Sequence, residues 1–133
     1  MTDDDSAGQS GIITELSPPP VNATISRLTS MIAAKGVRLF AVIHQRAEAA
    51  QAGLVLRETT LVIFGSPAAG NPVMAAAPLA ALDLPLKVLI WDDDGQAKVS
   101  YSAPAWLAAR NQLSDELANL AGIDPFTNAL TSR

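Results

Sequence analysis

The chain has 133 residues, of which 49% are hydrophobic and 17% are charged, and it carries a formal net charge of −4. These values predict one globular domain that buries about two thirds of the surface exposed by the unfolded chain. The nine Lys and Arg residues form no basic block that could neutralise a run of phosphates, so we expect no nucleic-acid partner. The absence of Cys excludes disulfides, thiolate nucleophiles and Cys-based metal sites, and it is consistent with a reducing compartment.

The N-terminal residues MTDDDSAGQS are acidic and polar, whereas a signal peptide begins with basic residues and continues with an apolar core. No run of the sequence approaches the roughly 20 apolar residues that span a bilayer. We therefore expect a cytoplasmic protein without a membrane partner. Residues 1–8 are predicted to be a disordered tail, because they offer almost no apolar side chains to bury, and residues 9–133 to form a single α+β domain.

The first half of the chain predicts a β-α-β start. Residues 11–16, GIITEL, are typical of a short strand, which the prolines at 18–20 end because proline cannot continue a ladder. Asn22 is positioned to cap a helix, and Gly36 is positioned to end it. A strand is expected over 37–44. The inner face of the helix is predicted to carry Ile25, Leu28 and Ile32.

The middle of the chain predicts a helical turn over 46–53 and then a strand over 58–65. This strand is apolar on both faces at its centre, which is typical of an interior strand. Asn71 followed by Pro72 predicts a capped helix start, with the helix running to about Ala81.

The last part predicts a β-hairpin followed by helices. The run LKVLIW is read as a strand, and Asp93, Asp94 and Gly95 as a tight turn. Pro104 begins a helical region, and a final helix is expected to end near Gly122. The return strand of the hairpin should point Ala97, Val99 and Tyr101 inward, and the final helix should point Leu113, Leu117 and Leu120 inward.

Several blocks occur in a specific order: AAKG, LFAVI, LVIFGSPAAGNP, DLPLKVLIWDDDG, and SYSAP followed by WLAAR. In this order they resemble the domain of unknown function 302 family, over roughly residues 11–110. The resemblance implies an α+β fold in which a β-α-β start leads into a mainly antiparallel sheet, with helices packed on one face and a C-terminal helix. It also implies frequent association as a homodimer, no agreed activity and no established catalytic residues. We expect no cofactor.

The chain departs from this family at two places. Relatives commonly read I-D-H at the end of the second strand, whereas this chain reads Ile43-His44-Gln45, and a shift of one residue in a strand changes the face on which a side chain lies. Relatives also tend to carry an Asp before the proline of the SYSAP block and a His after the arginine, where this chain has Ala103 and Asn111.

His44 is the only histidine and therefore the first candidate for acid–base chemistry or ligand binding. The alternative is a strand-end side chain that hydrogen bonds to its surroundings. No G-x-S-x-G elbow accompanies it, so no catalytic residue is predicted. No metal site is predicted either, because one His and no Cys leave only carboxylates, and the run at 92–94 does not have the spacing of a calcium loop.

The segment from Gly65 to Pro72 is a second candidate, because it joins a buried strand to a helix N-terminus, where backbone N–H groups favour an anion. Gly65, Ser66, Gly70 and Asn71 are its candidate ligand-binding residues. The alternative is a tight corner with Asn71 as its cap.

Trp91 and Tyr101, with Trp106 nearby, could face one another and line a small apolar pocket with a polar tip, or could be core or dimer contacts. Taken together, the sequence predicts an uncharacterised cytoplasmic homodimer that acts as a non-enzymatic binding or accessory protein. A small-molecule sensor or enzyme that uses His44 and the loop 66–71 is the first alternative. A structural module that binds partners through its Ala-rich helices is the second.

Overall fold

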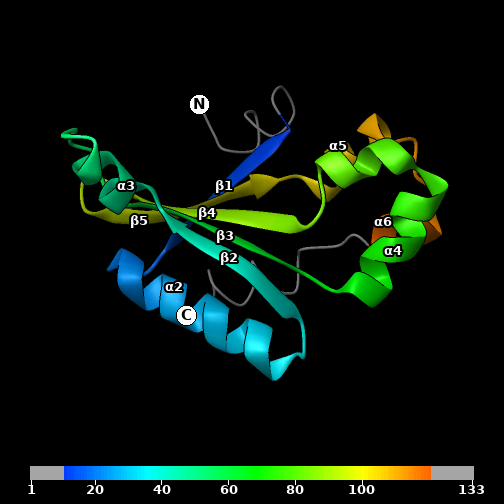
Figure 1. Cartoon of the computed structure of the whole chain (residues 1–133), viewed down its shortest axis with the longest axis horizontal. Coiled ribbons are helices and arrows are strands. Elements are labelled where there is room, and N and C mark those ends of the chain that lie inside the picture. Colours follow the sequence, from blue (N-terminus) through cyan, green and yellow to red (C-terminus); the bar gives the residue numbers. More distant parts are fainter. Residues whose placement is uncertain (1–10, 121–133) are drawn as a thin grey trace.

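The computed structural model describes residues 11–120, so the predicted tail 1–8 and the predicted helix end near Gly122 lie outside the described residues. One five-stranded sheet forms the centre of the fold, with the strand order β1-β5-β4-β3-β2 (Figure 1). The strands are β1 (Ile12–Ser17), β2 (Arg38–His44), β3 (Thr59–Gly65), β4 (Leu86–Asp93) and β5 (Gln96–Ser102).

Every pair of neighbouring strands is antiparallel. The chain does begin β-α-β, but β1 and β2 lie at opposite edges of the sheet, and the helix between them crosses under the other strands. The α+β fold class predicted from the sequence is confirmed.

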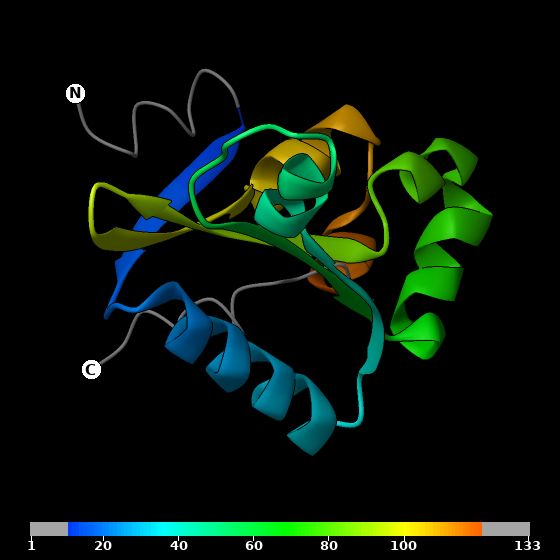
Figure 2. The same cartoon turned by 60° about the vertical axis from the view of Figure 1, so that its left-hand side comes forward.

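The helices are α2 (Val21–Ala34), α3 (Gln45–Gln51), α4 (Pro67–Ala76), α5 (Pro104–Arg110) and α6 (Asp115–Leu120), with the 3-10 helix η1 at Pro78–Leu82. Figures 1 and 2 show α2 along one face of the sheet, α3 at one end, and α4, α5 and α6 gathered at the other end. None of the helices within residues 11–120 has both the length and the apolar character needed to cross a lipid bilayer.

Helix α2 begins one residue earlier than its predicted cap. Pro20 occupies the N-cap position and makes no side-chain cap hydrogen bond, so the expectation that Asn22 caps the helix is wrong. The helix start is held instead by the buried Thr24, whose Oγ1 lies 2.8 Å from Ser17 Oγ. At the other end Gly36 adopts φ +67, a left-handed conformation that glycine reaches without strain, and it ends the helix as predicted.

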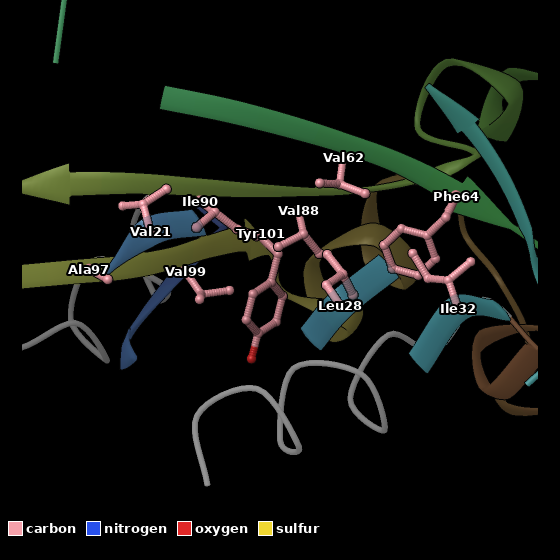
Figure 3. Close-up of a cluster of buried hydrophobic side chains, with 10 residues drawn as sticks. All are labelled: Val21, Leu28, Ile32, Val62, Phe64, Val88, Ile90, Ala97, Val99 and Tyr101. Atoms are coloured by element: carbon pink, nitrogen blue, oxygen red, sulfur yellow. The ribbon is translucent and has the colours of Figure 1, made fainter. Parts of the chain in front are cut away.

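The main hydrophobic core lies between α2 and the sheet. Strand positions two apart share a face, so alternate residues of β3, β4 and β5 point toward the helix. Because these side chains exclude water, they supply the main stabilisation of the fold. Figure 3 shows ten of them: Val21, Leu28, Ile32, Val62, Phe64, Val88, Ile90, Ala97, Val99 and Tyr101.

Strand β3 is interior, as predicted, but its two faces are not equally buried. Val62 and Phe64, which point toward α2, are fully buried, whereas Leu61 and Ile63 on the opposite face are only half-buried. The sequence shows two apolar faces, and only the face toward α2 is fully covered by residues 11–120.

The helix after β3 differs from its prediction at both ends. Ser66 is the N-cap and Pro67 occupies the first turn, so Gly70, Asn71 and Pro72 lie inside α4 rather than before it. Ser66-Pro67 and Asn71-Pro72 are both cap-proline pairs, and the chain uses the earlier one. The helix ends at Ala76 instead of Ala81, because the residue before a proline is pushed out of the helical region and Pro78 follows.

Strands β4 and β5 form the predicted hairpin. Asp94 and Gly95 adopt φ 51 and φ 92, which are the left-handed conformations of a two-residue hairpin turn. Asp93 lies opposite Gln96, and this pairing fixes the register of both strands.

Candidate functional site

A cleft of about 430 Å³ lies at the helical end of the molecule, between α4 with η1 on one side and the segment that links α5 to α6 on the other. Its volume falls within the range of small-molecule sites, about 300–1,000 Å³. Most of its wall is apolar, and three polar side chains come from the end of α5 and the residues that follow. The lining residues are Ala76, Ala77, Pro78, Leu79, Arg110, Asn111, Gln112, Leu113 and Leu117.

The polar side of the cleft is organised around Asp83. Asn111 Nδ2 donates to Asp83 Oδ2 at 2.9 Å and to the backbone oxygen of Leu107 at 3.0 Å, which fixes the direction of the amide. Arg110 Nε lies 3.5 Å from the same carboxylate oxygen, and its guanidinium lies 5.2 Å from the centre of the Trp106 ring. The half-exposed guanidinium is therefore held in place at the rim of the cleft.

The turn after α5 forms the floor of this polar side. Gln112 has φ 54, which is uncommon for a residue other than glycine, and the backbone N–H of Leu113 donates to Ala108 O at 2.9 Å. This hydrogen bond reverses the chain and turns Leu113 and Leu117 toward η1, where they pack beside the buried Val73 and Ala80.

The cleft offers the chemistry of binding rather than of bond cleavage. Its polar lining within the described residues consists of one guanidinium and two amides, and these groups are neither nucleophiles nor general bases at neutral pH. They can donate to and accept from the polar end of a ligand whose body contacts the alanine, proline and leucine wall.

The structure places His44 at the end of β2, opposite Thr60, with Nδ1 3.3 Å from Thr60 Oγ1. Gly65 and Ser66 lie at the other end of β3. Ser66 is six positions after Thr60, which in a strand is about 20 Å. The candidate that combined His44 with the loop 66–71 is therefore not assembled as one site.

The segment from Gly65 to Asn71 is a capped helix start. Ala69 N donates to Ser66 Oγ at 3.3 Å, and Pro67 has no N–H, so two of the first donor positions are unavailable to an anion. A Cβ added at Gly70 would meet only the Met74 methyl group at 3.8 Å, so Gly70 makes no close approach that requires glycine. Asn71 is exposed on the second turn of α4.

Trp91 and Tyr101 do not face one another. Trp91 lies opposite Lys98, and Tyr101 shares the other face of β5 with Val99, so the two rings lie on opposite faces of the sheet. Tyr101 is buried beneath the sheet and donates from its hydroxyl to Glu15 Oε1 at 2.7 Å. The hairpin turn at Asp94 and Gly95 already implies this register. Counting outward from the turn pairs Trp91 with Lys98, which places the rings of Trp91 and Tyr101 on opposite faces of the sheet.

Trp106 packs elsewhere, against the start of β1. A Cβ added at Gly11 would lie 2.4 Å from its ring. Within residues 11–120 the structure brings together no group of three or more His, Asp or Glu side chains suited to a metal ion.

Asp83 and Arg110 are not among the functional residues predicted from the sequence. The signal for them is weak, because Asp83 stands in a run of apolar residues before Pro85 and Arg110 closes the block WLAAR. Only the packing of η1 against α5 brings their side chains within 3.5 Å of each other.

Comparison with known proteins identifies the relatives of this fold. Residues 13–126 match the family model described as "Domain of unknown function DUF302". The crystal structure of an uncharacterized conserved DUF302 protein from Bacillus stearothermophilus superposes with a TM-score of 0.76 over 92% of this chain and 96% of that chain, at 18% sequence identity. This structural likeness shows the shared fold.

Two proteins of known sequence are similar over 105 residues at 37% identity. They are named Fluoride-specific ion channel FluC 1, from Brucella suis and from Brucella abortus. The matched region covers 78% of this chain but only 41% and 39% of those two proteins, so the chain spans about two fifths of their length. Because the family model matches residues 13–126, which make up most of this chain, the chain belongs to the family of the domain of unknown function DUF302.

Proposed function

We propose that this protein is a cytoplasmic, homodimeric and non-enzymatic binding domain that acts as an accessory to another protein. The observation that carries the proposal is the cleft of about 430 Å³ with an apolar wall and a fixed polar rim. Pockets of this kind bind small molecules through apolar contact and take their specificity from a few placed polar groups.

The chemistry of the cleft favours a ligand with an apolar body and one anionic or amide end. Arg110 supplies donors in a planar arrangement that suits a carboxylate. The Asp83 carboxylate beside it partly neutralises this charge, so the apolar wall contributes a large part of the binding free energy.

The accessory role draws support from the similar proteins named as fluoride-specific ion channels. In them the matched region is about two fifths of the chain, so a domain of this kind is joined to a larger remaining part. We propose that the domain binds a small molecule and that this binding regulates a partner protein.

The enzyme alternative has less support. It required His44 and the loop 66–71 to act on one substrate, whereas His44 pairs with Thr60 near the start of β3 and Ser66 follows the end of β3. The partner-binding alternative, through exposed apolar residues such as Leu79 and Leu82 on η1, is compatible with an accessory role and differs in needing no ligand.

The proposal is tested by thermal unfolding in the presence of hexanoate and benzoate, with hexanamide and benzamide as uncharged counterparts. We expect at least one of the four compounds to raise the melting temperature. A compound present at about a hundred times its dissociation constant stabilises the folded state by about 2.7 kcal/mol.

Ala76→Trp should abolish this response, because the indole fills the cleft from α4. Ala75→Trp is the matched control, since Ala75 is also exposed on α4 but does not line the cleft. His44→Ala should leave the response intact. Binding at this cleft would be contradicted if no compound raises the melting temperature, or if the rise survives in Ala76→Trp. A rise that is lost in His44→Ala would favour the sensor or enzyme alternative.

A further inference from the structure

The side-chain amide of Asn111 has a fixed orientation beside the cleft. Its Nδ2 donates to Asp83 Oδ2 at 2.9 Å and to Leu107 O at 3.0 Å. An amide nitrogen carries two hydrogens, so these two bonds use both of them. The reversed orientation would place Oδ1 against two acceptor oxygens, so the two partners exclude it. The carbonyl oxygen is therefore the only atom of this amide left for a further hydrogen bond.

The Oδ1 atom of Asn111 is accessible to a molecule in the cleft. Asn111 is half-buried and lines the cleft. Within residues 11–120 every buried side-chain nitrogen or oxygen has a hydrogen-bond partner, whereas the side-chain bonds of Asn111 are those of Nδ2 alone. Its Oδ1 is therefore not buried, and it offers an acceptor at this point of the wall. An acceptor pairs with an N–H or O–H of a ligand and not with a carboxylate, which has only acceptors.

Arg110 supplies donors beside this acceptor. Its Nε lies 3.5 Å from Asp83 Oδ2, and its guanidinium lies 5.2 Å from the centre of the Trp106 ring. The terminal amino groups of the guanidinium have no hydrogen-bond partner among the described residues, so they can donate to a carbonyl oxygen. The Gln112 amide has both a donor and an acceptor, so it does not discriminate between ligands. The rim of the cleft thus combines donors from Arg110 with an acceptor from Asn111.

Asp83 balances the charge of this rim. Arg110 is the only charged side chain among the described residues that line the cleft, and the Asp83 carboxylate lies against it. The pair together carries no net charge, and the whole chain carries −4. Moving a carboxylate out of water is costly unless an opposite charge compensates it. A neutral polar group therefore loses less than a carboxylate when it enters this cleft.

We infer that the cleft is selective for a neutral primary carboxamide on an apolar body, and that Asp83 sets this selectivity. The inference rests on the proposed function and names the ligand class of the same cleft. A carboxamide offers N–H groups to Asn111 Oδ1 and a carbonyl oxygen to Arg110, so it pairs both side chains through two different atoms. Asp83 does not line the cleft and is a positioning residue, because it acts through the two side chains that it holds.

The test compares three compounds with the same phenyl body: benzamide, benzoate and acetophenone. Benzamide is neutral and has both a donor and an acceptor, benzoate is charged and has only acceptors, and acetophenone is neutral and has only an acceptor. Their dissociation constants for the full chain are measured by ligand-observed NMR titration. We expect benzamide to bind at least about tenfold more tightly than either of the others, because both leave Asn111 Oδ1 without a donor.

Asp83→Asn tests the positioning role. It removes the negative charge beside Arg110 and keeps a carbonyl oxygen for Asn111, so the rim gains a net positive charge. The ratio of the benzoate to the benzamide dissociation constant should fall by about tenfold. A merely structural role would weaken both compounds and leave this ratio unchanged. Asp94→Asn is the matched control, because it removes the same charge from an exposed residue in the hairpin turn, at the other end of the sheet (Figure 1), and it should not change the ratio.

Asn111→Leu provides a second variant if Asp83→Asn does not fold. It removes the acceptor, so benzamide and acetophenone should bind equally well. A preference for benzamide over acetophenone that survives in Asn111→Leu, or a ratio that is unchanged in Asp83→Asn, would overturn the assigned roles of these residues.

The wild-type comparison separates this inference from the proposed function. Benzoate or acetophenone binding as tightly as benzamide would overturn the selectivity and leave the cleft as a binding site. Binding of none of the three compounds, or binding that Ala76→Trp does not abolish, would overturn both the selectivity and the proposed cleft.

Discussion

The burial of Phe64 allows a quantitative test of the core. Its side chain is 0% exposed and belongs to the cluster that contains Leu28 and Ile32 of α2. Phe64→Ala removes the ring from this cluster and leaves a cavity between the sheet and the helix, which costs about 3–5 kcal/mol in buried positions. The expected loss is therefore at least about a fifth of the free energy of unfolding of domains of this kind, which is about 5–15 kcal/mol.

Urea unfolding followed by tryptophan fluorescence measures this loss. With a denaturant dependence of about 2 kcal/mol per molar urea, the midpoint should fall by about 2 M. Phe40→Ala is the matched control, because Phe40 is 44% exposed on β2 and should cost about 1 kcal/mol or less. If Phe64→Ala does not fold, Phe64→Leu should show a smaller loss in the same direction. The assignment of the core to the α2 face of the sheet would be refuted if Phe64→Ala and Phe40→Ala lower the free energy of unfolding equally. A decrease below about 1 kcal/mol for Phe64→Ala would refute it as well.

Two further predictions concern the start of α4 and the hairpin. Ser66→Ala should lower the free energy of unfolding by about 1 kcal/mol in the same urea assay, because it removes the acceptor for Ala69 N. Asn71→Ala should change the free energy of unfolding by about 0.3 kcal/mol at most. A larger loss at Asn71 than at Ser66 would restore Asn71 as the cap. The hydrogen bond from Lys98, and then the charges of Lys98 and Arg57, outweigh partial burial and lower the pKa of Asp93 from its ordinary value of 3.8. The stabilising contribution of the Asp93 carboxylate should therefore be present above that pH and be lost as the pH falls below it. The difference in free energy of unfolding between the wild type and Asp93→Asn should shrink on acidification. A difference that grows on acidification would contradict the ion pairs of Asp93.

The sequence alone predicted most of the secondary structure, because its signals are local. Gly36 and the Asp94-Gly95 turn need backbone conformations with positive φ, and alternating apolar residues mark the strands. The interior position of β3 could also be predicted, since its apolar centre fits a strand with neighbours on both sides. The error at Asn71 arose because Ser66-Pro67 and Asn71-Pro72 are locally similar pairs, and the chain uses the earlier one as its cap. The error at Asn22 arose because α2 begins without a side-chain cap, and the contact of Thr24 with Ser17 holds its start instead.

The candidate site depended on relations between distant segments. Asp83 and Arg110 are 27 residues apart in the sequence and meet only because η1 packs against the end of α5. The separation of His44 from Ser66 follows from the antiparallel pairing of β2 with β3, which puts the end of one strand beside the start of the other. Residue types and periodicity determined which elements this chain forms. The tertiary structure decided which side chains meet and which sheet face α2 covers, because those outcomes depend on strand order and on where one long helix packs.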